Sequence, residues 1–206
     1  MIKKLLTSLL LSTAFMSMAA SAATFTVWKY SDSDDYYIQM DGDVVEGDAG
    51  RFKEAYYDQR IKARPTLFLD SSGGNAGAMH EVMKLIDAFN ITTRVGDGMR
   101  CYSACAEIWL AGKKRYLNGD YELGFHVGSF DPHYLHELFV EGGMDKVQET
   151  VQLYFSVDME HYVTEARLLQ PFKFAYYVAY YGYDSYNFYR PSKWDLENYV
   201  GVDGIW

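Results

Sequence analysis

A serine and a histidine, Ser103 and His126, have the residue types and positions that acyl transfer requires. Ser103 lies in "RCYSACAEIW", where a turn leads into a helical pattern, and His126 ends the apolar run "YELGFH". A serine hydroxyl is a weak nucleophile at neutral pH and needs a base such as imidazole to take its proton. Near a helix start the hydroxyl also lies at the positive end of the helix, where the Ala104 amide can face the same side. The pair therefore predicts a serine nucleophile with a histidine base.

A glycine pair earlier in the chain fits the same chemistry. In "LFLDSSGGNAGAMHEV" an apolar run stops at Gly73 and Gly74, and a helical pattern begins at once. Such a turn can aim backbone N–H groups at an anion. Acyl transfer through serine develops an oxyanion, so we expect the amides of Gly73, Gly74 and Ala104 to stabilise it.

Alternating strands and helices are expected to position these residues. Short β-branched or apolar runs predict strands, and apolar residues at helical spacing predict helices. The predicted strands cover residues 36–40, 65–70, 91–95, 114–118 and 121–127, and the predicted helices cover 47–59, 75–90 and 101–112. This alternation predicts an α/β fold with right-handed crossovers on a mainly parallel sheet.

The chain after residue 129 has a different pattern. Pro132 opens one helical segment, and residues 144–163 give a long amphipathic one. The following tail, "FAYYVAYYGYDSYNFYRPSKW", is crowded with tyrosine. We expect these rings to pack a C-terminal layer or a contact between subunits, since aromatic side chains dominate both kinds of interface.

The N-terminus has the features of a secretory signal. Lys3 and Lys4 precede an apolar run to about Met18, and residues 20–22 are the small residues Ala-Ser-Ala. This run is short for a membrane span and ends in a cleavage pattern. The sequence therefore predicts a signal peptide over residues 1–22, cleaved after Ala22, and a periplasmic or secreted protein.

Length and charge limit the class of the mature chain. Removing 22 of 206 residues leaves 184, enough for a single domain over residues 23–206 with a sizeable core. The loss of Lys3 and Lys4 takes the formal charge from −9 to −11, which argues against a nucleic-acid partner. Export also removes the protein from the ATP supply, so we expect no nucleotide and no cofactor.

The ordered motifs resemble a known family. "LDSSGGNAGAMHEVMKLI" followed by "CYSACAEIWLAGKKRYLNGDYELGFH" resembles the proteolytic subunit of the Clp protease and its exported, crotonase-like relatives. The resemblance covers residues 36–128, about half of the mature chain. It implies a crotonase-like spiral of ββα units with additional C-terminal helices that drive homo-oligomerisation. It also implies that Ser103 is the nucleophile and His126 the general base, with an oxyanion hole at Gly74 and Ala104 and with Gly73 in the same turn.

Two positions depart from the family pattern. Ser72 stands where the family has proline, so the glycine turn is less rigid. The family's third catalytic residue is an acid, but the matching place holds Asn187, Phe188 and Tyr189. Asp184 is our first choice for this role, and Asn187 and Asp158 are the alternatives. Asparagine can orient an imidazole but stabilises the imidazolium less than an acid does.

Two cysteines flank the candidate nucleophile. Cys101 and Cys105 would enter an oxidising compartment, where a disulfide can persist. Their spacing of one helical turn allows either a disulfide or two buried thiols. Both states remove the exposed thiolate that a cysteine nucleophile needs.

Metal chemistry is not expected. His126, His133 and His136 offer imidazoles, but the H-x-x-H spacing of the last two lacks a third ligand and the glutamate of a zinc hydrolase motif. We therefore predict no metal site.

Three functions remain open at this point. The leading hypothesis is an exported, ATP-independent serine hydrolase, specifically a peptidase that acts on short or unfolded peptides through an acyl-enzyme. The second is a binding or assembly module that keeps the crotonase-like scaffold without catalysis, as the unsettled third residue suggests. The third, an acyl-thioester enzyme, fits the fold but not a compartment without coenzyme A esters.

Overall fold

The core of the molecule is a six-stranded sheet. The computed structural model describes residues 21–126, 131–154, 167–184 and 186–206. The strand order is β1, β2, β3, β4, β6, β8, with β1 antiparallel to β2 and every other pair parallel. The strands are β1 (Thr24–Lys29), β2 (Tyr36–Asp41), β3 (Thr66–Asp70), β4 (Thr92–Val95), β6 (Lys114–Leu117) and β8 (Gly204–Ile205). The mainly parallel sheet confirms the predicted α/β class, whereas the two edge strands β1 and β8 have no counterpart in the prediction.

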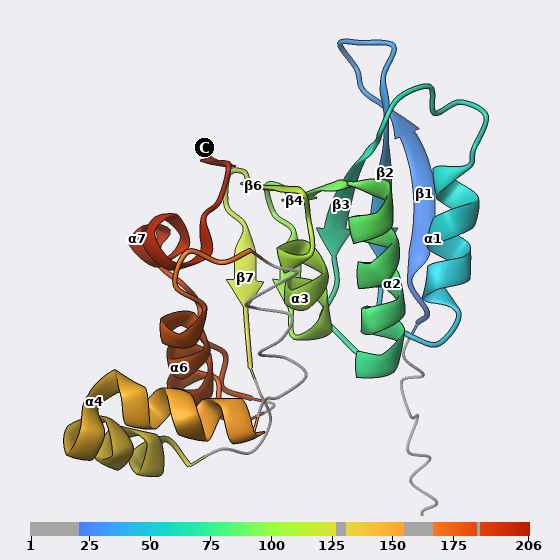
Figure 1. Ribbon diagram of the computed structural model, residues 1–206. Helices are drawn as coiled ribbons and strands as arrows, with labels where there is room; N and C mark the ends of the chain where they lie inside the picture. The colour runs from blue at the N-terminus through green and yellow to red at the C-terminus, as the bar shows by residue number, and fades with distance from the viewer. Residues whose placement is uncertain (1–20, 127–130, 155–166, 185) are drawn as a thin grey trace, which may run out of the picture.

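Three helices cover one face of this sheet (Figure 1). They are α1 (Asp48–Tyr56), α2 (Ala76–Phe89) and α3 (Ala104–Leu110). Alternate strand residues such as Ile38, Met40, Leu67 and Leu69 are fully buried. The apolar stripe of α2 is buried as well, as its helical spacing predicts. This packing fixes the ends of the strands and therefore the loops that follow them.

A second, two-stranded parallel sheet carries the candidate nucleophile and base. It consists of β5 (Arg100–Tyr102) and β7 (Glu122–Gly124). The prediction of a helix from residue 101 is wrong at its start, because α3 begins only at Ala104. The Ser71 N–H donates to Arg100 O (2.7 Å), and the Tyr102 N–H donates to Ser71 O (3.1 Å). Residues 100–102 are extended because they pair with Ser71, which is about thirty residues earlier in the chain. A local sequence pattern cannot indicate such a pairing.

The C-terminal part extends beyond the sheet (Figure 1). It contains α4 (Pro132–Tyr154), interrupted at Gly143, then α6 (Pro171–Tyr181), α7 (Lys193–Asp195) and a π-helical turn over Leu196–Val200. Tyr177 stacks on Tyr181, Tyr189 and Tyr199, with ring centroids 5.6–6.0 Å apart. These contacts agree with the expected aromatic layer. The amphipathic pattern predicted for residues 144–163 lies only partly within the described residues.

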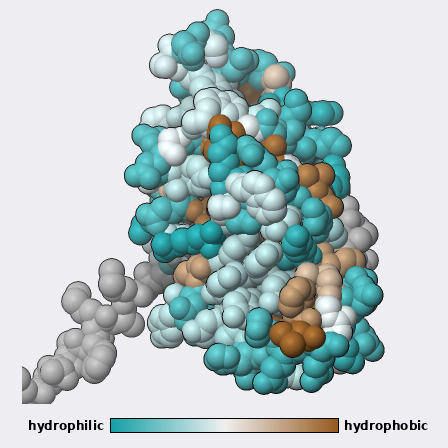
Figure 2. Space-filling view, turned by 90° about the vertical axis from the view of Figure 1, so that its left-hand side faces the viewer, coloured by the Kyte–Doolittle hydropathy of each residue, from teal (hydrophilic) through white to brown (hydrophobic). Residues whose placement is uncertain are grey.

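The surface over these helices is mostly hydrophilic, with an apolar patch at its lower end (Figure 2). On α4, Phe139 is 41% exposed and Val140 is 70% exposed. No helix in the described part of the chain combines the length and the apolar character that crossing a membrane requires. The predicted signal peptide lies almost wholly in residues 1–20, outside the described residues, and β1 begins two residues after the predicted cut.

Candidate active site

The glycine turn after β3 lies against the loop between β2 and α1 and against the candidate nucleophile. Gly73 and Gly74 have φ values of 105° and 142°, which favour glycine. A Cβ at Gly73 would lie 2.7 Å from the Ser103 Cβ, and one at Gly74 would lie 2.2 Å from the Val44 carbonyl oxygen. The missing side chains thus allow the turn to approach Ser103 closely.

Ser103 occupies the corner between β5 and α3. Its backbone has φ 54° and ψ −125°, an unusual conformation for a residue with a side chain. Its N–H donates to Gly124 O at the end of β7 (2.9 Å), and its hydroxyl makes no capping bond to α3. The hydroxyl is instead directed at His126, with 2.6 Å between Ser103 Oγ and His126 Nε2.

His126 lies two residues after the end of β7 and is half-buried. Phe125 before it forms an antiparallel bridge with Tyr189, and the Phe188 ring meets the imidazole edge-on with centroids 5.0 Å apart. Burial lowers the pKa of His126 below its ordinary 6.5, and the nearby charge of Asp184 opposes this in part. The imidazole is therefore neutral at neutral pH, the state that can accept a proton from serine.

Two backbone amides near Ser103 are available to an oxyanion. Among the described residues, the N–H groups of Gly74 and Ala104 have no hydrogen-bond acceptor. The Gly73 N–H, expected to be a third donor, donates to Ser71 Oγ instead (3.1 Å). The expectation for Gly73 needs this correction: its amide holds the turn together, and its contribution is the space that it leaves for Ser103.

Neither Asp184 nor Asn187 forms a hydrogen bond with His126. The His126 Nδ1 is buried and has no hydrogen-bond partner among the residues that the structure describes. The Asp184 carboxylate accepts the N–H groups of Tyr186 (2.7 Å) and Asn187 (2.8 Å), and the Asn187 side chain also donates to it (3.0 Å). These bonds lower the pKa of Asp184. Asp184 therefore acts on His126 through its charge and not by a direct bond, and Asp158 lies outside the described residues.

A disulfide spans the candidate nucleophile. The sulfurs of Cys101 in β5 and Cys105 in α3 are joined, and both residues are fully buried. Of the two states that the spacing allowed, the structure has the disulfide. No free cysteine remains to act as a nucleophile, since these are the only two cysteines in the chain.

Sequence reasoning missed two residues that shape the site. Ser71 holds the glycine turn through its Oγ, and Phe188 packs against both His126 and Tyr102. The run "SSGG" offered a weak signal for Ser71. The family resemblance pointed to residues 187–189 as the place of the third catalytic residue, but not to a ring contact of Phe188, which depends on the pairing of Phe125 with Tyr189.

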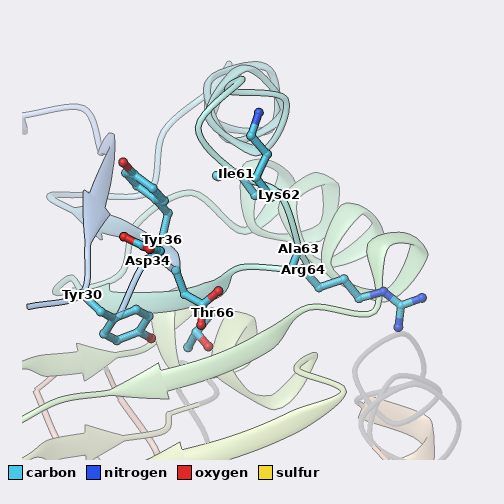
Figure 3. A pocket seen from close by; sticks show the side chains of 9 residues that line it. Tyr30, Asp34, Tyr36, Ile61, Lys62, Ala63, Arg64 and Thr66 are labelled. Carbon is cyan, nitrogen blue, oxygen red and sulfur yellow. The ribbon is translucent and has the colours of Figure 1, made fainter. Parts of the chain in front are cut away.

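Elsewhere in the described part of the chain we find no site of comparable chemistry. Among the described residues, no three histidine, cysteine or acidic side chains are grouped to hold a metal ion. A pocket of about 210 Å³ opens at the start of β2 and β3, the end of the strands opposite the glycine turn. Its lining includes Tyr36, Lys62, Arg64 and Thr66 (Figure 3). No nucleophile and base meet there.

Comparison with known proteins supports the fold. No protein-family model matches the chain, and no curated protein matches it. Among solved structures, the chain is similar to a point mutant of ClpP1 from Listeria monocytogenes, with 16% identity and a TM-score of 0.50 over 82% of this chain and 89% of that one.

Two further structures are more distant. A point mutant of the 1510-N membrane-bound stomatin-specific protease has 12% identity and a TM-score of 0.47, over 82% of this chain and 77% of that one. Methylmalonyl CoA decarboxylase has 9% identity and a TM-score of 0.49, over 88% of this chain and 67% of that one. The ClpP1 match shows that the chain has a ClpP-like fold, as the sequence resemblance implied.

Proposed function

We propose that the protein is an exported serine hydrolase, specifically a peptidase that works without ATP. One observation carries the proposal: Ser103 Oγ lies 2.6 Å from the Nε2 of a half-buried His126, at a corner where the serine does not cap its helix. The fold is shared by proteins of different activities, so the argument rests on these side chains and not on the fold.

The geometry suits a two-step mechanism. Ser103 Oγ attacks the substrate carbonyl carbon while its proton passes to His126 Nε2. The amides of Gly74 and Ala104 stabilise the negative oxygen of the tetrahedral intermediate. The C–N bond then breaks, and the imidazolium gives its proton to the leaving amine. Water, deprotonated by the same imidazole, hydrolyses the acyl-enzyme and restores Ser103.

Asp184 has an indirect role in this mechanism. Its negative charge raises the pKa of His126 against the effect of burial, which stabilises the imidazolium formed during attack. Because Nδ1 has no partner in the described part of the chain, packing against Phe188 is the contact that orients the imidazole there. We therefore expect a slower enzyme than one with a hydrogen-bonded acid.

The proposed compartment, substrate and oligomeric state rest on features outside the Ser103–His126 pair. The signal pattern before Ala23 and the disulfide both suit a periplasmic or secreted protein. Short or unfolded peptides are the proposed substrates, since the chemistry acts on an exposed carbonyl and needs no nucleotide. The exposed Phe139 and Val140 of α4 support a homo-oligomer, whose size light scattering on the mature protein would give.

A fluorophosphonate probe tests the serine mechanism. We expect the purified mature protein to be labelled covalently and the Ser103→Ala variant to show no labelling. Ser33→Ala, which alters an exposed serine in the loop between β1 and β2, is the matched control and should label like the parent. Labelling that persists in Ser103→Ala would overturn the mechanism.

Peptidase activity needs a separate measurement. We expect a fluorescently labelled unfolded protein to be cleaved slowly without ATP, with the cleavage lost in Ser103→Ala. If the probe reacts with Ser103 but only small esters are hydrolysed, the protein is a serine hydrolase of another substrate class.

A non-catalytic binding or assembly module is the second candidate. The observation that favours it is the buried His126 Nδ1, to which no described residue supplies the partner that efficient triads have. A strain carrying Ser103→Ala would then behave like the parent strain wherever deletion of the protein has an effect. The hydrolase predicts that this strain behaves like the deletion.

A further inference from the structure

The disulfide lies across Ser103, the proposed nucleophile. Cys101 belongs to β5, Cys105 lies in the first turn of α3, and Ser103 is midway between them. Both cysteines have no exposed surface. A crosslink over so short a segment leaves the enclosed residues few backbone conformations.

The enclosed conformation is not the one that a serine at a helix start usually adopts. A serine N-cap normally has extended backbone angles, and its Oγ accepts the N–H of the second or third helical residue, here Cys105 or Ala106. Ser103 has φ 54° and ψ −125° and makes no such bond. Asn75, at the start of α2, shows the normal arrangement: φ is −71°, ψ is 122°, and its side chain accepts the Ala78 N–H at 2.8 Å.

Two uses therefore compete for Ser103 Oγ: capping α3 or approaching His126. The capping conformation requires the backbone of residue 103 to rotate to negative φ, which moves the first turn of α3 relative to β5. The disulfide joins these two elements. Other contacts also hold Ser103: its N–H donates to Gly124 O, its carbonyl oxygen accepts the Glu107 N–H (3.2 Å), and Gly73 lies close to it.

We propose that the Cys101–Cys105 disulfide is a positioning device that denies Ser103 the capping conformation and presents its hydroxyl to His126. The proposal rests on the proposed function for its consequence: a chain folded with reduced cysteines has the fold but not a competent nucleophile. Forming the bond removes two protons and two electrons from the thiols, and a disulfide oxidant takes up the electrons by thiol–disulfide exchange. The peptidase thus becomes competent only in an oxidising compartment.

The first test compares two forms of the same chain. The mature protein is refolded either with a thiol reductant or with oxidised glutathione, and fluorophosphonate labelling is followed at a temperature where both forms are folded. We expect the reduced form to label at least 10-fold more slowly. Equal rates would overturn the proposal.

A variant pair separates positioning from general stability. Cys101→Ala/Cys105→Ala removes the crosslink without leaving a polar atom in a buried place. Ile38→Ala destabilises the fully buried middle of β2, away from this corner, and is the matched control. Slow labelling of the cysteine variant alone, with both variants folded, supports positioning. Equal slowing of both would show that the disulfide acts only through stability.

A readout that does not require catalysis keeps the two proposals distinguishable. The 13Cα and 13Cβ chemical shifts of Ser103 report its backbone conformation in oxidised and cysteine-free protein. We expect positive φ in the first and an extended, capping φ in the second. If the shifts change but neither form is labelled, the positioning role stands and the proposed hydrolase fails. If the shifts are the same in both forms, the positioning role fails.

Discussion

Two strand-to-helix corners of this protein start from similar residues and end differently. After β3 the chain turns into α2 at Asn75, whose side chain caps the helix by accepting the Ala78 N–H. After β5 it turns into α3 at Ser103, whose hydroxyl leaves its helix uncapped and lies 2.6 Å from His126 Nε2. A polar side chain at a helix start is available for chemistry only when the backbone conformation prevents it from capping the helix. The first corner stabilises the fold, and the second serves the proposed reaction.

Among the changes that test this difference between the two corners, removal of the base should have the largest effect on the labelling rate. His126→Ala removes the imidazole that contacts the Ser103 hydroxyl. We expect fluorophosphonate labelling to slow by about 100-fold or more, because general base catalysis contributes about 10²–10⁴-fold. The rate constant of labelling measures this, and His80→Ala, at a histidine of α2, is the control. A rate within a few-fold of the parent would show that Ser103 does not depend on His126.

The second largest effect is expected when a side chain fills the space beside Ser103. In Gly73→Ala the new Cβ would lie 2.7 Å from the Ser103 Cβ and 2.8 Å from the Tyr102 carbonyl oxygen, at a φ of 105°. Backbone strain and overpacking together should lower the free energy of unfolding by about 3 kcal/mol. Labelling should slow by about 10-fold or more even where the variant is folded.

The control for Gly73→Ala is Gly98→Ala. Gly98 also has positive φ, 70°, but a Cβ there would meet no atom within 4 Å. Backbone strain alone should lower its free energy of unfolding by about 1 kcal/mol. Chemical denaturation measures both variants, and equal losses would contradict the close approach of Gly73 to Ser103.

Asn75→Ala tests the structural corner. Loss of the side-chain cap should lower the free energy of unfolding by about 1 kcal/mol, the usual loss for such a substitution. The labelling rate of the folded variant should stay within a few-fold of the parent. Urea denaturation and labelling are measured on the same sample. A lower labelling rate with unchanged stability would contradict a purely structural role of Asn75.

The pH dependence gives the smallest expected effect. Because burial lowers the pKa of His126 below 6.5, labelling should rise with pH and reach half of its maximum below pH 6.5. The Asp184 charge raises this pKa, so Asp184→Asn should move the midpoint further down. Asp34→Asn, at an exposed acid paired with Lys29 in the β1–β2 loop, should leave the midpoint unchanged.

Stability should follow the same titration. The unfolded chain binds a proton at His126 near pH 6.5, whereas the folded chain binds it only at lower pH. The contribution of His126 to the free energy of unfolding is therefore fully present above pH 6.5 and declines as the pH falls. His126→Ala should remove that part of the acid sensitivity.

Local patterns predicted the parts of the fold that local forces determine. The apolar spacing from Met79 to Ile86 marked α2, and the order of glycine turn, Ser103 and His126 indicated the site before any distance was known. Strand β5 escaped prediction because hydrogen bonds to Ser71 and pairing with β7 make it extended. Its three residues carry no periodic signal of their own.

The surroundings of His126 depend on chain more than fifty residues later. Gly182 packs so closely on the strand end that a Cβ there would lie 2.3 Å from the Phe125 carbonyl oxygen. The Phe125–Tyr189 bridge then brings Phe188 to the imidazole, while Asp184 is held by its own loop. Such placement follows from tertiary packing, so neither the contact of Phe188 nor the missing bond of Asp184 could be predicted from residue types.

The central claim is that the hydroxyl freed from capping at the second corner is the nucleophile. Fluorophosphonate-treated mature protein, digested and examined by mass spectrometry, tests it most directly. We expect one adduct, on the peptide that contains Ser103, and none on any other serine. An adduct on a different residue, or no adduct after prolonged exposure of folded, oxidised protein, would contradict it.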